Sequence, residues 1–116
     1  MNELEIKAYI KKLRAEKIFD RFQIAQIEMG LENNIDVDIY LDPEYDFTQM
    51  ESIRLGLEDK LNVYLYLYKD MLSYRMDKIR RDLEHRRFVR SEYYYFNEEA
   101  KKFLIKEKYL EKNKEK

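Results

Sequence analysis

His85 is the only histidine in the chain, and no cysteine is present. A Ser-His or Cys-His nucleophile would therefore depend on a single base, with a serine or threonine hydroxyl as its partner. The available hydroxyls are those of Thr48, Ser52, Ser73 and Ser91. Nothing around them resembles a nucleophile elbow or an oxyanion loop. We interpret His85 as a surface residue of a basic helix end, and we expect a non-enzymatic protein without a cofactor.

A cluster of carboxylates near the middle of the chain is a candidate partner-binding face. Its members are Asp36, Asp38, Asp42, Glu44 and Asp46. They could gather a hard cation, but the EF-hand spacing fails because Tyr40 stands where the third ligand belongs and no central glycine follows. Capping of helix ends explains three of the acids without a metal. We expect no metal site, and an acidic face of this kind can imitate nucleic-acid phosphate and occupy a basic groove on a partner.

A basic and aromatic segment over 80–95 is the second candidate contact. Its members are Arg80, Arg81, Arg86, Arg87, Arg90, Tyr93, Tyr94 and Tyr95. Arginines followed by tyrosines can hold phosphates while the rings stack on bases, which gives direct RNA or DNA binding as the alternative function. Against it stand the acids between the arginines, which are ordinary helix pairing partners, and a pI of only 6.0. A solvated helix face, with its tyrosines packed on a terminal helix, is the other interpretation.

The chain holds 11 tyrosines, which is more than a small core can readily hide. Tyrosine and arginine are the residues that dominate protein interfaces. We expect part of the tyrosines, among them the series Tyr64, Tyr66 and Tyr68, to lie at a partner or self-association surface. The others should pack in the core or half-buried against it.

The elements that must position these residues follow from an internal repeat with a period of 26. Residues 23–32 match residues 49–58, and a third, degenerate copy over 75–84 keeps the apolar positions but has Asp82 in place of the glycine. Units this short cannot bury their own apolar faces, so the copies must stack. The predicted core positions are Ile24, Ile27 and Leu31 in the first copy, and Met50, Ile53 and Leu57 in the second.

Each of the first two copies opens with a capping-box pattern. Asp20 precedes Gln23 by three residues, and Asp46 precedes Gln49 in the same way, so each acid can accept from free helix amides while the glutamine reaches back. A glycine near the end of each helix costs about 1 kcal/mol relative to alanine. Two equivalent glycines, Gly30 and Gly56, therefore indicate close packing at that position.

The second half of each copy allows two interpretations. Residues 63–68 alternate between apolar residues and tyrosine, which is typical of a strand. Alternatively, Asp36 and Asn62 are N-caps of short second helices, with Pro43 ending the first of them. We favour the helices, because strands would leave exposed edges in a small stack.

Composition and the terminal segments complete the expected organisation. With 41% charged residues, two glycines and one proline, the 116-residue chain is typical of a helical protein. We predict an all-α single domain over 1–116, with an N-terminal capping helix (1–18), three degenerate repeats (19–96), and a C-terminal helix with a frayed tail (97–116). The absence of cysteine and of a long apolar run favours a cytoplasmic protein without a membrane partner.

The second copy also resembles a known repeat. Its core, Gln49-Met50-x-x-Ile53-Arg54-x-Gly56-Leu57-Glu58, resembles a short tandem repeat of bacterial phage, plasmid and conjugative-element proteins. The first copy departs from this pattern with Ile24 and Glu28, and the third loses both its glutamine and its glycine. No catalytic residue comes with the resemblance. It implies a small protein from a mobile element, and such proteins often bind host or rival machinery. We expect this one to bind and inhibit a protein or nucleoprotein target, with an anti-CRISPR or other anti-defence role as one form.

Overall fold

The computed structural model describes the backbone of residues 1–93 and the side chains of residues 1–86. All its regular elements in that range are helical, as predicted. They are α1 (Glu3–Glu16), α2 (Arg21–Glu32), the 3-10 helix η1 (Val37–Ile39), α3 (Phe47–Glu58), the 3-10 helix η2 (Val63–Leu65) and α4 (Ser73–Tyr93). The predicted C-terminal helix over 97–116 lies outside the described residues.

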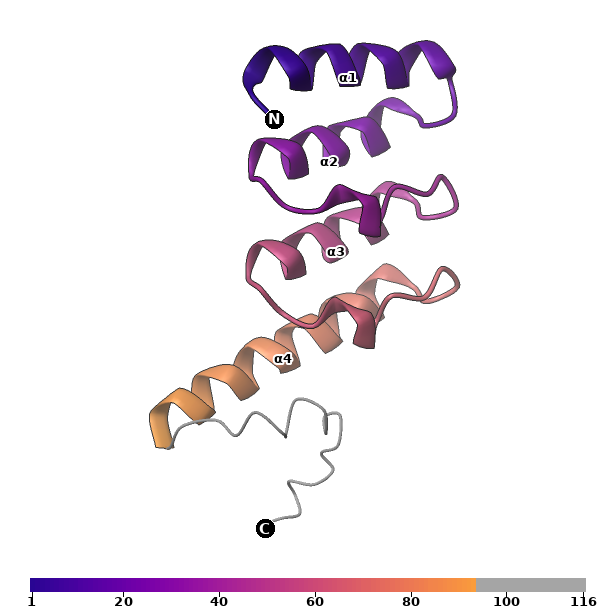
Figure 1. Cartoon of the computed structure of the whole chain (residues 1–116). Coiled ribbons are helices and arrows are strands. Elements are labelled where there is room, and N and C mark those ends of the chain that lie inside the picture. Colours follow the sequence, from indigo (N-terminus) through magenta and orange to yellow (C-terminus); the bar gives the residue numbers. More distant parts are fainter. Residues whose placement is uncertain (94–116) are drawn as a thin grey trace. The chain divides into compact units, whose positions relative to one another are not determined.

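Two compact units divide the chain, Met1–Leu83 and Glu84–Lys116. The first contains α1 to α3, both 3-10 helices and the first half of α4. Within it, α1 packs on α2 and α2 packs on α3, with α2 and α3 running in the same direction (Figure 1). Of the second unit, the structure describes only the second half of α4. The predicted domain boundaries stay predictions.

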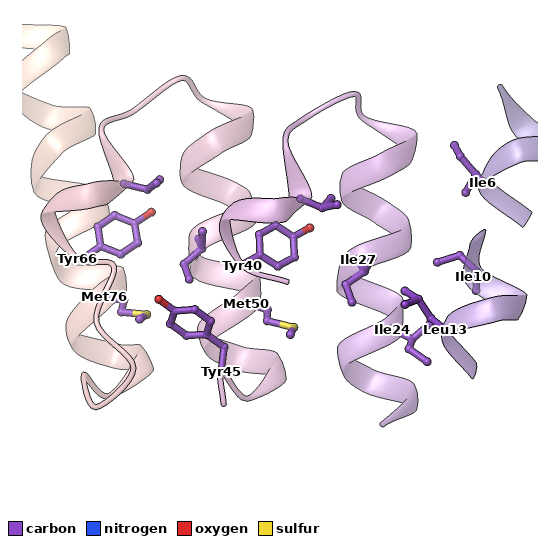
Figure 2. Close-up of a cluster of buried hydrophobic side chains, with 13 residues drawn as sticks. Ile6, Ile10, Leu13, Ile24, Ile27, Tyr40, Tyr45, Met50, Tyr66 and Met76 are labelled. Atoms are coloured by element: carbon purple, nitrogen blue, oxygen red, sulfur yellow. The ribbon is translucent and has the colours of Figure 1, made fainter. Parts of the chain in front are cut away.

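The core of the first unit consists of the predicted apolar faces of successive helices. Ile27, Met50 and Ile53 are fully buried, and Leu31 and Leu57 pack against them while partly exposed. Figure 2 shows Ile24 and Ile27 of α2 facing Ile10 and Leu13, which α1 turns toward α2, with Met50 on the next helix. The predicted core positions are therefore confirmed, and in α1 the apolar side chain of Leu4 lies in solvent.

α2 and α3 each begin with the capping box that the sequence predicted. The Asp20 carboxylate accepts from the Gln23 amide at 2.8 Å, and the Gln23 side chain accepts from the Asp20 amide. Asp46 and Gln49 make the same pair of bonds at 2.9 Å. The helices end with a backbone bond from residue 35 to residue 30 and from residue 61 to residue 56, after left-handed residues at 34 and 60.

The ambiguous segments are one-turn 3-10 helices. Asp36 and Asn62 cap them through their side chains, as in the favoured interpretation. Burial does not follow the alternation that suggested a strand, because Val63 and Tyr66, three residues apart, are buried while Tyr64 and Tyr68 are exposed. Figure 2 shows the buried rings of Tyr40 and Tyr66 among the helices, and their hydroxyls donate to the carbonyls of residues 26 and 52.

The third predicted helix pair differs from the expectation, because α4 continues for 21 residues through Tyr93. The first two helices end after 12 residues, before the left-handed positions 34 and 60 and the capping positions 36 and 62. The equivalent residues of α4 are Arg86 and Phe88. A phenylalanine side chain cannot accept a hydrogen bond, so it cannot cap a new helix, and the existing helix continues instead.

Candidate interaction surface

The loops that follow η1 and η2 are fixed by the same glutamines that cap the helices. Gln23 is buried and donates its side-chain amide to the carbonyls of Tyr45 at 2.7 Å and Pro43 at 3.2 Å. Gln49 donates in the same way to two carbonyls of the next loop, at 2.9 and 2.7 Å. Each glutamine thus holds a helix start and the loop beside it in one arrangement.

The predicted acidic residues lie on and beside the first of these loops, and most have local partners. Asp36 caps η1 by accepting from the Asp38 amide at 3.1 Å. Asp46 caps α3 and also accepts from the Thr48 hydroxyl at 2.6 Å. Asp38 itself is exposed. The capping roles inferred for Asp36 and Asp46 are confirmed. Capping was also expected of Asp42, but its carboxylate accepts from the Glu44 amide at 2.9 Å in a turn, and no helix begins there.

A lysine links the two loops across this surface. Lys69, on the second loop, lies 2.7 Å from Asp42 and 3.4 Å from Glu44 on the first. The hydrogen bond from Lys69, and then the backbone bond from Glu44, hold the pKa of Asp42 below its ordinary value. The same contacts with Asp42 and Glu44 raise the pKa of Lys69. Part of the predicted acidic face is therefore neutralised within the molecule.

Apolar side chains replace acids at the equivalent places of the second loop. One repeat period after Asp38, Asp42 and Asp46 stand Tyr64, Tyr68 and Leu72. These three side chains are 62%, 55% and 64% exposed, and Tyr74 beside them is 70% exposed. We call Tyr64, Tyr68, Leu72 and Tyr74 the tyrosine patch. We call the loop that carries Asp42 and Glu44 the acidic loop. The contacts of Lys69 with these two residues show that the two loops are neighbours.

Sequence reasoning expected exposed tyrosines but did not identify this set. Grouping Tyr64, Tyr66 and Tyr68 as one series mixed two exposed rings with a buried one. The signal that finds the patch is the comparison of equivalent positions. Tyr40 and Tyr66 are the same core residue in both copies, whereas the patch residues differ from their counterparts.

The predicted basic and aromatic contact is only partly within the described side chains. Arg80 is 14% exposed and lies 3.3 Å from Asp77, which accepts from the Ser52 hydroxyl, so this arginine contributes to packing. Arg81 and Arg86 are exposed, as is His85. The structure does not describe the remaining side chains of the set, which are those of Arg87, Arg90, Tyr93, Tyr94 and Tyr95.

A series of polar side chains, buried at Gln26 and Arg54 and reaching the surface at Asn33, joins α2 to α3, and the sequence analysis did not find it. Arg54 donates through Nε to the side-chain oxygen of Gln26 at 2.9 Å and pairs with Glu58 at 2.7 Å. Glu58 also accepts from the Asn33 side chain at 2.6 Å. Tyr40 lies near the Arg54 and Glu58 side chains, and burial raises the pKa of its hydroxyl. The hydroxyl therefore stays protonated and donates to the carbonyl of Gln26.

Comparison with protein-family models, with curated proteins and with solved structures finds no match to this chain. Among the described residues, no helix is long and apolar enough to cross a membrane. No group of three or more potential ligands in that part of the chain is placed to hold a metal ion. The tyrosine patch and the acidic loop beside it are thus the strongest candidate surface in the described structure.

Proposed function

We propose that this chain is a stack of short repeated units that binds a protein partner and inhibits it without catalysis. The recurrence of contacts supports the repeat: capping boxes, glutamine-to-loop bonds and tyrosine-to-carbonyl bonds each occur twice, one repeat period apart. Stacks of this kind present equivalent loops side by side, which suits them to binding extended surfaces.

The observation that carries the proposal is the tyrosine patch. Exposed tyrosine and leucine side chains that follow one another closely along the second loop and the start of α4 are of the kind that marks protein-binding sites. Acids flank it at the equivalent positions of the preceding loop, and the glutamine and lysine contacts hold both loops in place before binding. The partner that fits has apolar side chains beside basic ones. The likeness to mobile-element repeats favours a cytoplasmic anti-defence target.

The test replaces patch residues with their counterparts from the first loop. The triple variant Tyr64→Asp, Tyr68→Asp and Leu72→Asp should fold, because the equivalent loop carries aspartate at all three places. We expect it to lose the partner that the wild-type chain captures from the source cell. Leu4→Ser, at an exposed residue of α1, is the matched control and should retain the partner. Capture by the triple variant at the wild-type level would contradict the proposed surface.

The same samples address direct nucleic-acid binding through the segment 80–95. Filter binding over a salt series would give an affinity that falls steeply with salt if phosphates are neutralised. Binding lost on reversal of Arg81 and Arg86, and retained in the tyrosine-patch variant, would replace the proposal with this alternative.

A further inference from the structure

Two exposed phenylalanines lie together where α2 and α3 begin. Phe22 is 49% exposed and Phe47 is 39% exposed, and their ring centroids are 5.2 Å apart with the rings tilted by 33°. Phe22 is the second residue of α2 and Phe47 the first of α3. We call them the phenylalanine pair. Neither ring belongs to the tyrosine patch, and Phe47 directly follows Asp46 of the acidic set.

Stacking of the helices does not require these rings. One repeat period after Phe22 and Phe47 stand Thr48 and Ser73, at the corresponding starts of α3 and α4. The Ser52 hydroxyl of α3 bonds to Asp77 of α4 at 2.7 Å, so these two helices meet with two small polar residues at their starts, where α2 and α3 have two aromatic ones. An exposed aromatic pair that the fold can replace with a threonine and a serine points to binding.

Opposite charges flank the phenylalanine pair on its two helices. The Arg21 guanidinium lies 4.9 Å from the centre of the Phe22 ring. Glu51 is exposed one turn after Phe47, and residues four apart lie on the same side of a helix. Among the described contacts, neither Arg21 nor Glu51 forms an ion pair. The patch therefore has a cation on the α2 side and an anion on the α3 side.

We infer that a second copy of this chain docks on the phenylalanine pair. A two-fold axis through the pair would place the four rings together and set Arg21 of each copy against Glu51 of the other, because an isologous contact uses the same patch twice. A surface with apolar residues at its centre and opposite charges on either side is complementary to itself under this rotation. An acidic protein would attract Arg21 but be repelled by Glu51, whereas a second copy of this chain is complementary to both.

The test measures mass by light scattering and sedimentation over about 1 µM to 1 mM protein. The wild-type chain should approach twice its 14.5 kDa mass as the concentration rises. The variant Phe22→Thr with Phe47→Ser, which copies the residues of the next helix contact, should dissociate at least about tenfold more readily while keeping its helical circular dichroism. A wild-type chain that stays monomeric at every concentration would overturn the inference.

A charge exchange distinguishes this interface from other modes of association. Arg21→Glu alone and Glu51→Arg alone should each weaken the dimer about tenfold, and the double variant should restore it. Failure of the double variant to restore the dimer would overturn the proposed geometry. Tyr64→Asp with Tyr68→Asp is the control and should leave the dimer intact. Loss of partner capture in that control, with dimerisation unchanged, would separate this inference from the proposed function.

Discussion

At Gly30 and Gly56, helix packing leaves no room for a Cβ atom. A Cβ atom built on Gly56 would collide with the hydroxyl of Tyr66 and lie 2.6 Å from Cγ1 of Val63. Gly30 has the equivalent neighbours. The Tyr66 hydroxyl cannot retreat freely, because it donates to the carbonyl of Ser52 at 2.8 Å within the core. Each glycine is therefore needed because a buried tyrosine, Tyr40 at Gly30 and Tyr66 at Gly56, packs directly against it.

Gly56→Ala should lower the free energy of unfolding by about 1–3 kcal/mol, since the added methyl group overpacks a filled site. Helix propensity alone would give the opposite sign, a gain of about 1 kcal/mol. Urea unfolding followed by circular dichroism measures the difference. A variant as stable as the wild-type chain would show that the tyrosine can move aside at no cost.

Asp82→Ala provides the control, because Asp82 occupies the equivalent position of α4 and is exposed. Its side chain pairs with Lys78, at 3.8 Å on an open surface. Exposed pairs of this kind contribute little, so the free energy of unfolding should change by less than about 1 kcal/mol.

Among the elements, the helix starts are the part that the sequence predicts best. An aspartate followed three residues later by glutamine has few ways to satisfy helix amides, and both predicted capping boxes form. The second role of Gln23 and Gln49 depends on a loop some 20 residues further on, and no local pattern reports it. The Arg54–Gln26 bond is similar, since its partners are 28 residues apart.

The third copy shows where a pattern of apolar positions stops being informative. Met76 is buried and Ile79 is partly buried, as the repeat predicts. Whether the helix stops where α2 and α3 stop depends instead on the polar residues at its end. The tyrosine patch is harder still to predict from the sequence. A repeat is recognised from positions at which the copies agree, whereas the patch consists of positions at which the second copy differs from the first.

The link between the two loops should make stability depend on pH. Asp42 is held below its ordinary pKa by its bonds with Lys69 and Glu44. For Asp46, burial raises the pKa, but bonds from Thr48 and Gln49 outweigh it, and the net pKa is lowered. A carboxyl with a lowered folded-state pKa stabilises the fold above its unfolded-state value near 4, and this stabilisation is lost as pH falls through the folded-state pKa.

We therefore expect a free energy of unfolding that is nearly constant from about pH 5 to 8 and declines below about pH 4. The variant Asp42→Asn with Asp46→Asn should show a shallower decline, because two of the groups responsible no longer titrate. Urea unfolding at a series of pH values checks this. Asp38→Asn is the control, since that exposed carboxylate caps nothing, and its curve should follow the wild type. An equal slope in all three chains would rule out these two aspartates as the source.

At the scale of the first unit, charged residues in α4 occupy positions whose equivalents in α2 and α3 are buried. Positions 23, 26 and 30 of α2 are buried, and so are the equivalent positions 49, 52 and 56 of α3. In α4 the same positions are Arg75, Lys78 and Asp82, and all three are exposed. In the proposed stack, these charges give α4 the polar outer face that a terminal unit needs. A further unit packed there would have to bury three charges.

This arrangement makes the middle of the first unit its most stable part. α3 contributes Met50 and Ile53, both fully buried, and packs on α2, while its Ser52 bonds to Asp77 of α4. Among the described helices, α1 has extensive contacts with α2 alone. In a stack stabilised by nearest neighbours, a terminal helix can open without its neighbours, whereas an internal one cannot.

Hydrogen exchange should therefore be slowest in α3 and at least about tenfold faster in α1. Leu13→Ala removes a buried contact between α1 and α2, so it should speed exchange in α1 more than in α3. Exchange measured by mass spectrometry at the level of single helices tests both expectations. Equal protection of α1 and α3 would mean that the first unit unfolds in one step. It would contradict the expectation that a terminal helix opens independently of the internal ones.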